Sequence, residues 1–199
     1  MDFDALAEAV AKRIFIPLEA SGRHVHLTRE QALTLFGHPL TPKRPLSQPG
    51  QFLANERVTV VGPKGEFANV AVLGPERSEG QVEISLTDGK HLGVTPPVRL
   101  SGQLIKTPGI RIKTPKGCVD LERGLIVAQR HIHMSPEDAA RMGIEDKQMV
   151  RVQTFTDRPV TLHSVMIRVH PDFETSMHLD YDEANACGFH EGDLGRIIQ

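Results

Sequence analysis

The feature that most constrains this chain is an internal repeat. Residues 23–32 read RHVHLTREQA and residues 130–139 read RHIHMSPEDA, at a constant offset of 107 residues in a chain of 199. The copies are identical or similar at nine of ten positions, far beyond chance for so short a chain. A solenoid needs about three or more copies. The repeat therefore predicts two related half-molecules.

Each copy predicts a strand that runs into a helix. Alternate side chains of a strand share a face, so both histidines of a pair point one way while Val25 or Ile132 points into the core. Thr28 and Ser135 then occupy the N-cap position of a helix, and Gln31 or Asp138 three residues later completes a capping-box pattern.

The paired histidines predict a metal site. Neutral imidazole suits Zn²⁺, and two imidazoles on one strand face provide two of its ligands. One pair alone is weak evidence, but His24 and His26 return as His131 and His133, and His178 again stands between apolar neighbours. The other five histidines lack this context, and we expect them in loops or on the surface: His38, His91, His163, His170 and His190.

A catalytic metal site also needs an acid or an open position. Glu83 lies in a predicted strand, on the face opposite Val82 and Ile84, where it could equally be a solvent-facing edge residue. By their local sequence alone, Arg77 would be an exposed loop cation and Ser21 a turn residue.

The rest of the chain predicts a mainly β fold. After an amphipathic helix at 2–14, short Val/Ile/Leu runs alternate with Gly and Pro, as in a sandwich or barrel. Helices are predicted at 29–36, 136–142 and 180–186. The predicted strands lie at 57–61, 68–73, 81–86, 109–113, 124–129, 149–154 and 164–169.

Composition excludes several classes of protein. A formal charge of −2 argues against nucleic-acid binding, and no apolar run approaches the roughly 20 residues of a membrane span. The N-terminus lacks the apolar region of a secretory signal. The two cysteines, Cys118 and Cys187, form no disulfide framework, so we expect a reducing, cytoplasmic location.

Several segments together resemble one family, the phosphate propanoyltransferases of the PduL type, which are phosphotransacylases. The resemblance covers the chain from about residue 16 onward. It rests on SGRHVH at 21–26, Arg77 with QVE at 81–83, PVRLSG at 97–102, QRHIH at 129–133, HLD at 178–180 and EAN at 183–185.

The resemblance implies two small, pseudo-symmetric β-barrel domains with short helices and an active site at the domain interface. One domain would comprise residues 1–22 plus 129–199, and the other residues 23–128. The implied reaction converts acyl-CoA (propionyl-CoA or acetyl-CoA) plus phosphate into acyl phosphate plus CoA. A homodimer is expected, and the family admits a location in the lumen of a bacterial microcompartment, with shell or core proteins as partners.

The resemblance also assigns roles to residues. Two zinc ions would be held by His24, His26, Glu83, His131, His133 and His178. Arg77 matches a phosphate-binding arginine and Ser21 an active-site serine. CoA would contact Pro97, Arg99, Ser101 and Asn185. Leu100 departs from the more polar residue expected at its position, which affects the substrate side and not the metal ligands.

The abundance of metal ligands favours direct attack of phosphate on the thioester, without an acyl-cysteine. Three other classes remain open: a cupin-like protein with one metal on His24, His26 and Glu30; a metal-dependent thioester hydrolase; and a non-enzymatic metal-binding module that adheres to a shell through residues 2–14. A hydrolase of the metallo-β-lactamase kind would need Asp and His where Thr28 and Arg29 stand.

Overall fold

The computed structural model describes residues 14–198, so the helix predicted for 2–14 falls almost wholly outside the described residues. The chain divides into two compact units. Unit 1 comprises the residues up to Ser21 together with Gln129–Gln199, and unit 2 comprises Gly22–Ala128.

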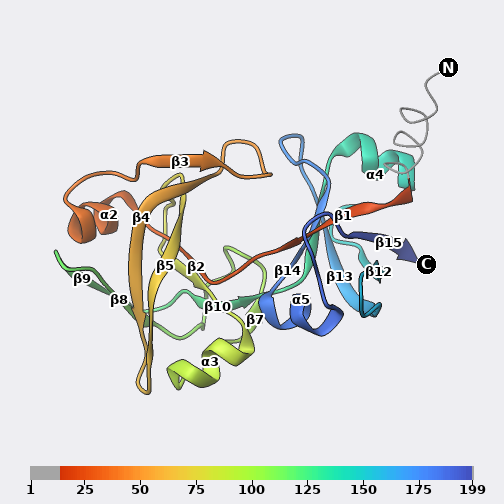
Figure 1. Ribbon diagram of the computed structural model, residues 1–199. Helices are drawn as coiled ribbons and strands as arrows, with labels where there is room; N and C mark the ends of the chain where they lie inside the picture. The colour runs from red at the N-terminus through yellow and green to blue at the C-terminus, as the bar shows by residue number, and fades with distance from the viewer. Residues whose placement is uncertain (1–13, 199) are drawn as a thin grey trace. The chain divides into compact units, whose positions relative to one another are not determined.

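Unit 1 is a closed six-stranded barrel (Figure 1). Its strands are β1 (Ile16–Ala20), β11 (His131–Met134), β12 (Met149–Phe155), β13 (Thr161–Val169), β14 (Ser176–Leu179) and β15 (Leu194–Ile198). Around the barrel they follow the order β1-β14-β11-β13-β12-β15. Helix α4 (Pro136–Met142) follows β11, and α5 (Tyr181–Cys187) follows β14. Aliphatic and Met side chains fill the core, with Ile132 fully buried among them.

Unit 2 is a curled sheet with the order β7-β10-β6-β2-β5-β4-β8-β9, and β3 pairs with β4. Its strands are β2 (His24–His26), β3 (Pro42–Pro45), β4 (Phe52–Val61), β5 (Glu66–Gly74), β6 (Gln81–Glu83), β7 (Val98–Arg99), β8 (Ile110–Lys113), β9 (Cys118–Leu121) and β10 (Leu125–Ala128). Helix α2 (Arg29–Phe36) follows β2, and α3 (Leu86–Leu92) follows β6. Val25 is fully buried in its core.

The prediction of a mainly β chain with two barrel-like domains is confirmed, although the sheet of unit 2 is curled and not closed. Helices predicted at 29–36 and 136–142 have these bounds, and the third begins one residue later than predicted. The strand predicted at 81–86 is wrong in its second half. It ends at Glu83, because Ser85 caps α3 by accepting a hydrogen bond from the backbone N–H of Asp88.

The predicted caps are confirmed at one helix and half confirmed at the other. Thr28 and Gln31 form a reciprocal capping box at α2. Ser135 accepts from the Asp138 backbone N–H at α4, but the Asp138 carboxylate does not return the bond. That carboxylate instead accepts from the Thr175 hydroxyl and from Arg141.

The strand register is the same around both histidine pairs. β2 pairs antiparallel with β6 and parallel with β5, and β11 pairs antiparallel with β14 and parallel with β13. The 107-residue offset extends into the preceding strands: Leu18 of β1 faces Met177, and Leu125 of β10 faces Val82, both in parallel pairs. Strand β1 belongs to unit 1 but comes just before the histidine pair of unit 2 in the sequence. Strand β10 belongs to unit 2 but comes just before the histidine pair of unit 1. The compact units and the sequence repeats therefore divide the chain at different points.

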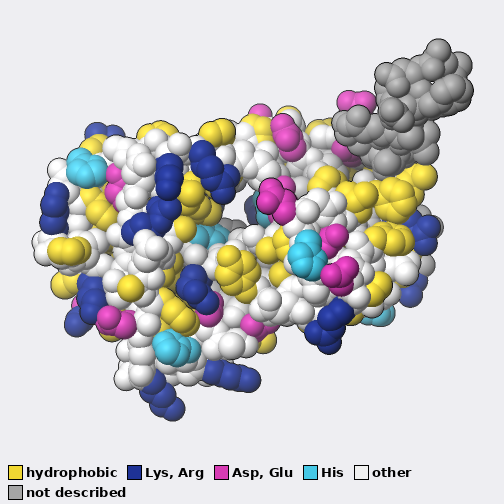
Figure 2. Space-filling view, in the orientation of Figure 1, with side chains coloured by type: hydrophobic (Ala, Val, Ile, Leu, Met, Phe, Trp, Pro, Cys, Tyr) yellow, Lys and Arg dark blue, Asp and Glu magenta, His cyan; other side chains and the backbone are white. Residues whose placement is uncertain are grey.

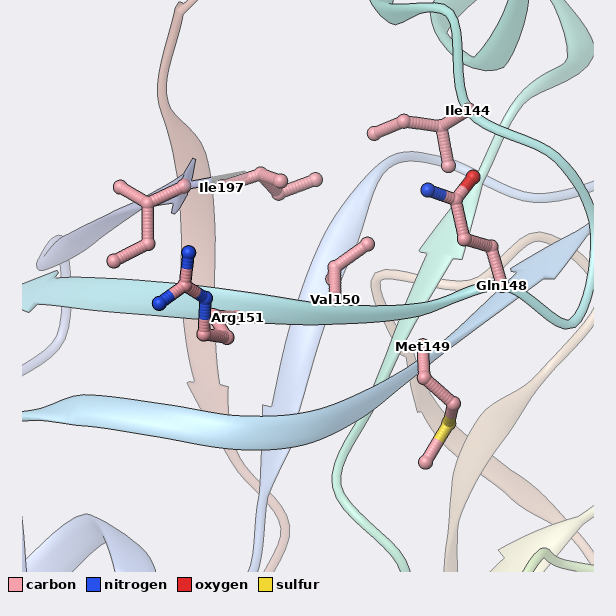
Figure 3. A pocket seen from close by; sticks show the side chains of 7 residues that line it. Ile144, Gln148, Met149, Val150, Arg151 and Ile197 are labelled. Atoms are coloured by element: carbon pink, nitrogen blue, oxygen red, sulfur yellow. The ribbon is translucent and has the colours of Figure 1, made fainter.

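The surface of the described residues carries mixed charge and one pocket in unit 1. Both signs of charge occur on each unit on the face shown in Figure 2. Within residues 14–198, no helix has the length and apolar character needed to cross a membrane. A pocket in unit 1 is lined by Ile144, Gln148, Met149, Val150, Arg151, Ile197 and Ile198, and includes none of the predicted site residues (Figure 3).

Candidate metal centres

The first candidate centre lies in unit 2, where β2 and β6 run antiparallel. Their register sets His24 opposite Glu83 and His26 opposite Gln81. The Glu83 carboxylate lies 3.5 Å from His24 Nε2 through Oε2 and 3.9 Å from His26 Nε2 through Oε1. All these side chains are buried. Because β6 lies between β10 and β2, the alternative that Glu83 is an exposed edge residue is wrong.

Burial and charge set the protonation states of this triad. Burial would lower the pKa of His24, but the adjacent Glu83 carboxylate raises it above its ordinary value. The pKa of His26 lies well below its ordinary value because the ring is buried and because His24 and Arg77 add positive charge nearby. Burial would raise the pKa of Glu83, but the two histidines lower it strongly. An ionised carboxylate and a neutral imidazole are the forms that bind metals.

A buried amide supports the Glu83 carboxylate. Gln81 Nε2 donates to Glu83 Oε1 at 2.5 Å and to Ser101 Oγ at 2.8 Å, and Gln81 Oε1 accepts from the Gly102 backbone N–H at 2.8 Å. Arg77 Nη1 also donates to Ser101 Oγ, at 3.0 Å. The predicted phosphate ligand, one predicted CoA contact and one predicted metal ligand therefore belong to a single hydrogen-bonded group.

The second candidate centre lies in unit 1, on β11 and β14. The register sets His131 opposite His178, and their rings stack with centroids 5.1 Å apart. His133 Nδ1 lies 3.1 Å from His178 Nε2, and Ser176 Oγ lies 3.2 Å from the same atom. Two nitrogen ligands of one tetrahedral zinc ion lie about 3.3 Å apart, given zinc–nitrogen bonds of about 2.0–2.1 Å. The spacing of these rings therefore suits zinc.

The first histidine of each pair is oriented for metal binding. His24 Nδ1 lies 2.8 Å from the Gly22 carbonyl oxygen, and His131 Nδ1 lies 2.8 Å from that of Gln129. A carbonyl oxygen only accepts, so each Nδ1 carries a proton, and in the neutral ring Nε2 then has the lone pair that can bind a metal. Hydrogen bonds of this kind fix the tautomer of metal-binding histidines. Within each triad one ligand atom per residue lies within 4.8 Å of the others. Both triads therefore fit a divalent metal ion.

The remaining predicted site residues belong partly to unit 2 and partly to unit 1. Pro97 and Arg99 belong to the segment of unit 2 that leads to Ser101, and Arg99 is exposed on β7. Ser21 follows β1 in unit 1, and Asn185 is exposed on α5 of the same unit.

Burial divides the ten histidines into the two predicted groups. The five that form the triads are buried or half-buried, and the five outside the repeated motif are all exposed. Glu30, the third ligand expected of a cupin-like site, is exposed in the first turn of α2. Among the described residues it belongs to neither triad.

Two arginine–carboxylate pairs beside the triads escaped the sequence analysis. Arg23, directly before the first pair, donates to Asp88 through Nε at 3.1 Å and Nη2 at 2.7 Å. Arg130, directly before the second, donates to Glu183 at 2.6 Å. Each acid is the third residue of the helix that follows the third-ligand strand. Each pair therefore connects a histidine strand to that helix.

A second, weaker repeat encodes these acids. QVEISLTD at 81–88 corresponds to SMHLDYDE at 176–183, at an offset of 95 residues. The third ligand, the helix cap and the helix acid occupy matching positions: Glu83 and His178, Ser85 and Asp180, Asp88 and Glu183. None of the eight paired residues is identical, so the pattern is visible only once the strand pairing is known.

Comparison with known proteins points to one family. The sequence profile described as phosphate propanoyltransferase matches residues 17–190. A phosphate propanoyltransferase of Clostridioides difficile (strain 630) is 53% identical over 192 residues, or 96% of this chain and 92% of the relative. One from Enterococcus faecalis is 50% identical over 202 residues (98% and 96%). One from Salmonella typhimurium is 51% identical over 175 residues (87% and 83%).

Proposed function

Because this chain belongs to the phosphate propanoyltransferase family and is an acyltransferase, we propose that it interconverts acyl-CoA plus phosphate with acyl phosphate plus CoA. The relatives' name specifies the propanoyl group, and we propose propionyl-CoA as the acyl donor, with acetyl-CoA as an alternative. The observation that carries the proposal is the pair of buried, pseudo-equivalent triads.

The proposal assigns one zinc ion to each triad. His24, His26 and Glu83 would hold the first, and His131, His133 and His178 the second. When bound, such ions supply Lewis acidity toward the thioester carbonyl and positive charge for phosphate. The chain's contribution is to hold the imidazole rings and the carboxylate in place, since five of the six side chains are buried and His178 is half-buried.

Arg77 is proposed to bind phosphate. Its planar guanidinium suits two phosphate oxygens at once, and its Nη1 is held by Ser101 Oγ at 3.0 Å. A phosphate oxygen attacks the thioester carbonyl carbon, the carbon–sulfur bond breaks, and CoA leaves as the thiolate. Ser21 is proposed as a further active-site residue, and Pro97, Arg99, Ser101 and Asn185 as CoA contacts.

The cysteines support direct transfer. Cys187 is fully buried, its thiol donates to the Ala184 carbonyl, and burial raises the pKa of that thiol. A raised pKa disfavours the thiolate that acyl transfer to cysteine requires. Cys118 is exposed on β9, and among the described residues neither cysteine belongs to a metal-binding group.

The test follows release of the CoA thiol from propionyl-CoA with and without phosphate, and traps acyl phosphate as a hydroxamate. We expect release only with phosphate, in equal amount to acyl phosphate, and loss of both after metal chelation. His26→Ala should lower kcat by at least about 100-fold, whereas His170→Ala, a change at an exposed histidine outside the triads, should leave it unchanged. Release that does not depend on phosphate would instead indicate a thioester hydrolase.

A further inference from the structure

We propose that Gln81 is a positioning residue that sets which oxygen of Glu83 faces the metal and that couples this ligand to the turn containing Ser101. The inference rests on the proposed function, since it requires a metal in the unit 2 triad.

The Gln81 side chain is 1% exposed and uses its hydrogen-bonding capacity within the protein. Its two amide N–H groups go to Glu83 Oε1 and Ser101 Oγ, and its carbonyl oxygen accepts from the Gly102 backbone N–H. With a partner on each side, the amide cannot rotate or flip without breaking buried hydrogen bonds. Each such loss costs about 1–3 kcal/mol.

This fixed amide makes the two oxygens of Glu83 different. Oε1 takes the 2.5 Å hydrogen bond from Gln81, whereas Oε2 is the oxygen nearer to His24, at 3.5 Å. Outer hydrogen bonds of this kind orient ligating carboxylates and tune metal affinity. Oε1 also faces the triad, 3.9 Å from His26 Nε2, but it already accepts from Gln81, so Oε2 keeps more of its lone-pair capacity for a metal.

The same amide reaches the proposed phosphate site. Ser101 Oγ accepts from Gln81 at 2.8 Å and from Arg77 at 3.0 Å. Displacement of the Gln81 side chain would thus disturb Glu83 and the partner of Arg77 together. Metal affinity in unit 2 and the KM for phosphate should change in the same variants.

Unit 1 provides an internal comparison. Ser176 faces His133 as Gln81 faces His26, yet serine has a short side chain and a single hydroxyl. A long amide with two donors is needed only where the third ligand is a carboxylate. The difference between Gln81 and Ser176 therefore follows the difference between Glu83 and His178.

The experiment measures zinc affinity by chelator competition in the full chain. Gln81→Met removes the donors at similar volume, and Gln81→Glu keeps the shape but replaces the donors by a second carboxylate. Both are made in the wild type and in a His133→Ala background, in which the unit 1 triad is broken. Gln48→Met, at a buried glutamine between β3 and β4, is the matched control.

We expect zinc binding in unit 2 to weaken by about 10- to 100-fold in both Gln81 variants. The KM for phosphate should rise with it, and Gln48→Met should change neither quantity. In a His26→Ala background, which isolates unit 1, Gln81→Met should leave zinc affinity unchanged. If Gln81→Met fails to fold by circular dichroism, the Gln81→Glu result decides.

Unaltered unit 2 affinity in a folded Gln81 variant would overturn the inference alone. Equal weakening of zinc binding in both units would also overturn it, because it would indicate a general loss of structure. Wild-type protein that binds no zinc would overturn the proposed metal chemistry, and this inference with it.

Discussion

Units 1 and 2 place their third metal ligand at the same position but use different chemistry there. Glu83 faces His24 across β2 and β6, and His178 faces His131 across β11 and β14. The shared register explains the position. The residue type determines what must surround it, since a carboxylate requires donors and an imidazole N–H requires an acceptor.

The strand on the other side of the third ligand shows this dependence. Glu19 of β1 faces His178, with its carboxylate 3.9 Å from His178 Nδ1. Ile126 of β10, 107 residues later, faces Glu83 at the equivalent position. A carboxylate at position 126 would repel that of Glu83. The two halves therefore differ both in the third ligand and in the residue that faces it.

A second difference concerns the proposed phosphate ligand. The Arg77 backbone N–H donates to the Leu27 carbonyl just after β2, and the His170 N–H makes the same bond to Met134 in unit 1. Unit 2 thus presents an arginine where unit 1 presents an exposed histidine. Of these two positions, only that of unit 2 carries the guanidinium that the proposed phosphate site requires.

The largest expected effect comes from breaking either triad. His26→Ala and His133→Ala should each lower kcat by at least about 100-fold, more than the loss of an outer-shell partner costs. The double variant should be little worse than either single one, because residues that act as a unit are non-additive. Steady-state kinetics with propionyl-CoA and phosphate provides the check. Independent, multiplicative losses would show that the triads do not serve one reaction.

Arg77→Lys should raise the KM for phosphate by about 10-fold or more, because lysine cannot form the paired hydrogen bonds of a guanidinium. His170→Lys at the corresponding position of unit 1 should leave that KM within about twofold. Initial rates measured over a range of phosphate concentrations distinguish the two. A larger rise in the KM for phosphate from His170→Lys than from Arg77→Lys would show that phosphate binds in unit 1 and not in unit 2.

Glu19→Ile installs in unit 1 the residue that unit 2 carries at the equivalent position. We expect zinc affinity of unit 1 to fall about 10-fold, the lower end for loss of an outer-shell partner, because the 3.9 Å contact is long and Glu19 is partly exposed. The zinc affinity of unit 1 in Glu19→Asp should lie between those of the wild type and Glu19→Ile. The zinc affinity of unit 2 should not change in either variant. Chelator competition in the His26→Ala background measures the zinc affinity of unit 1. An unchanged affinity in Glu19→Ile would show that Glu19 does not support zinc binding there.

The smallest effects should come from the arginine pairs. Asp88→Asn should destabilise the protein by about 2 kcal/mol and Glu183→Gln by about 1 kcal/mol, since Arg23 donates twice to Asp88 whereas one bond links Arg130 to Glu183. Urea denaturation of the zinc-loaded protein reports both values. If Glu183→Gln destabilised the protein more than Asp88→Asn, the number of arginine hydrogen bonds would not explain the difference between the two variants.

The sequence predicts the parts of the fold that depend on local pattern. The helix at 29–36 follows from its cap and spacing, and the mainly β class follows from short apolar runs between glycines and prolines. The sequence does not reveal helix α3, because the run at 81–86 reads as one continuous strand, although Ser85 and Asp88 cap a helix that begins at Leu86.

For the candidate centres, the histidine pairs stand out in the repeat, but their surroundings do not. Glu19 lies beside His178 only through strand register, which no local pattern identifies. Gln81 and Glu83 share a face of one strand, but the other partners of Gln81, Ser101 and Gly102, are about 20 residues away in the sequence. The 95-residue offset relates segments without identical residues, so it becomes readable only from the folded sheet.

We propose that each unit holds one metal ion in its own triad. Native mass spectrometry of the zinc-loaded chain counts the bound ions, with His26→Ala, His133→Ala and the double variant beside the wild type. We expect two zinc ions per wild-type chain, one in each single variant and none in the double variant. A single zinc ion in the wild type, or two in either single variant, would contradict it.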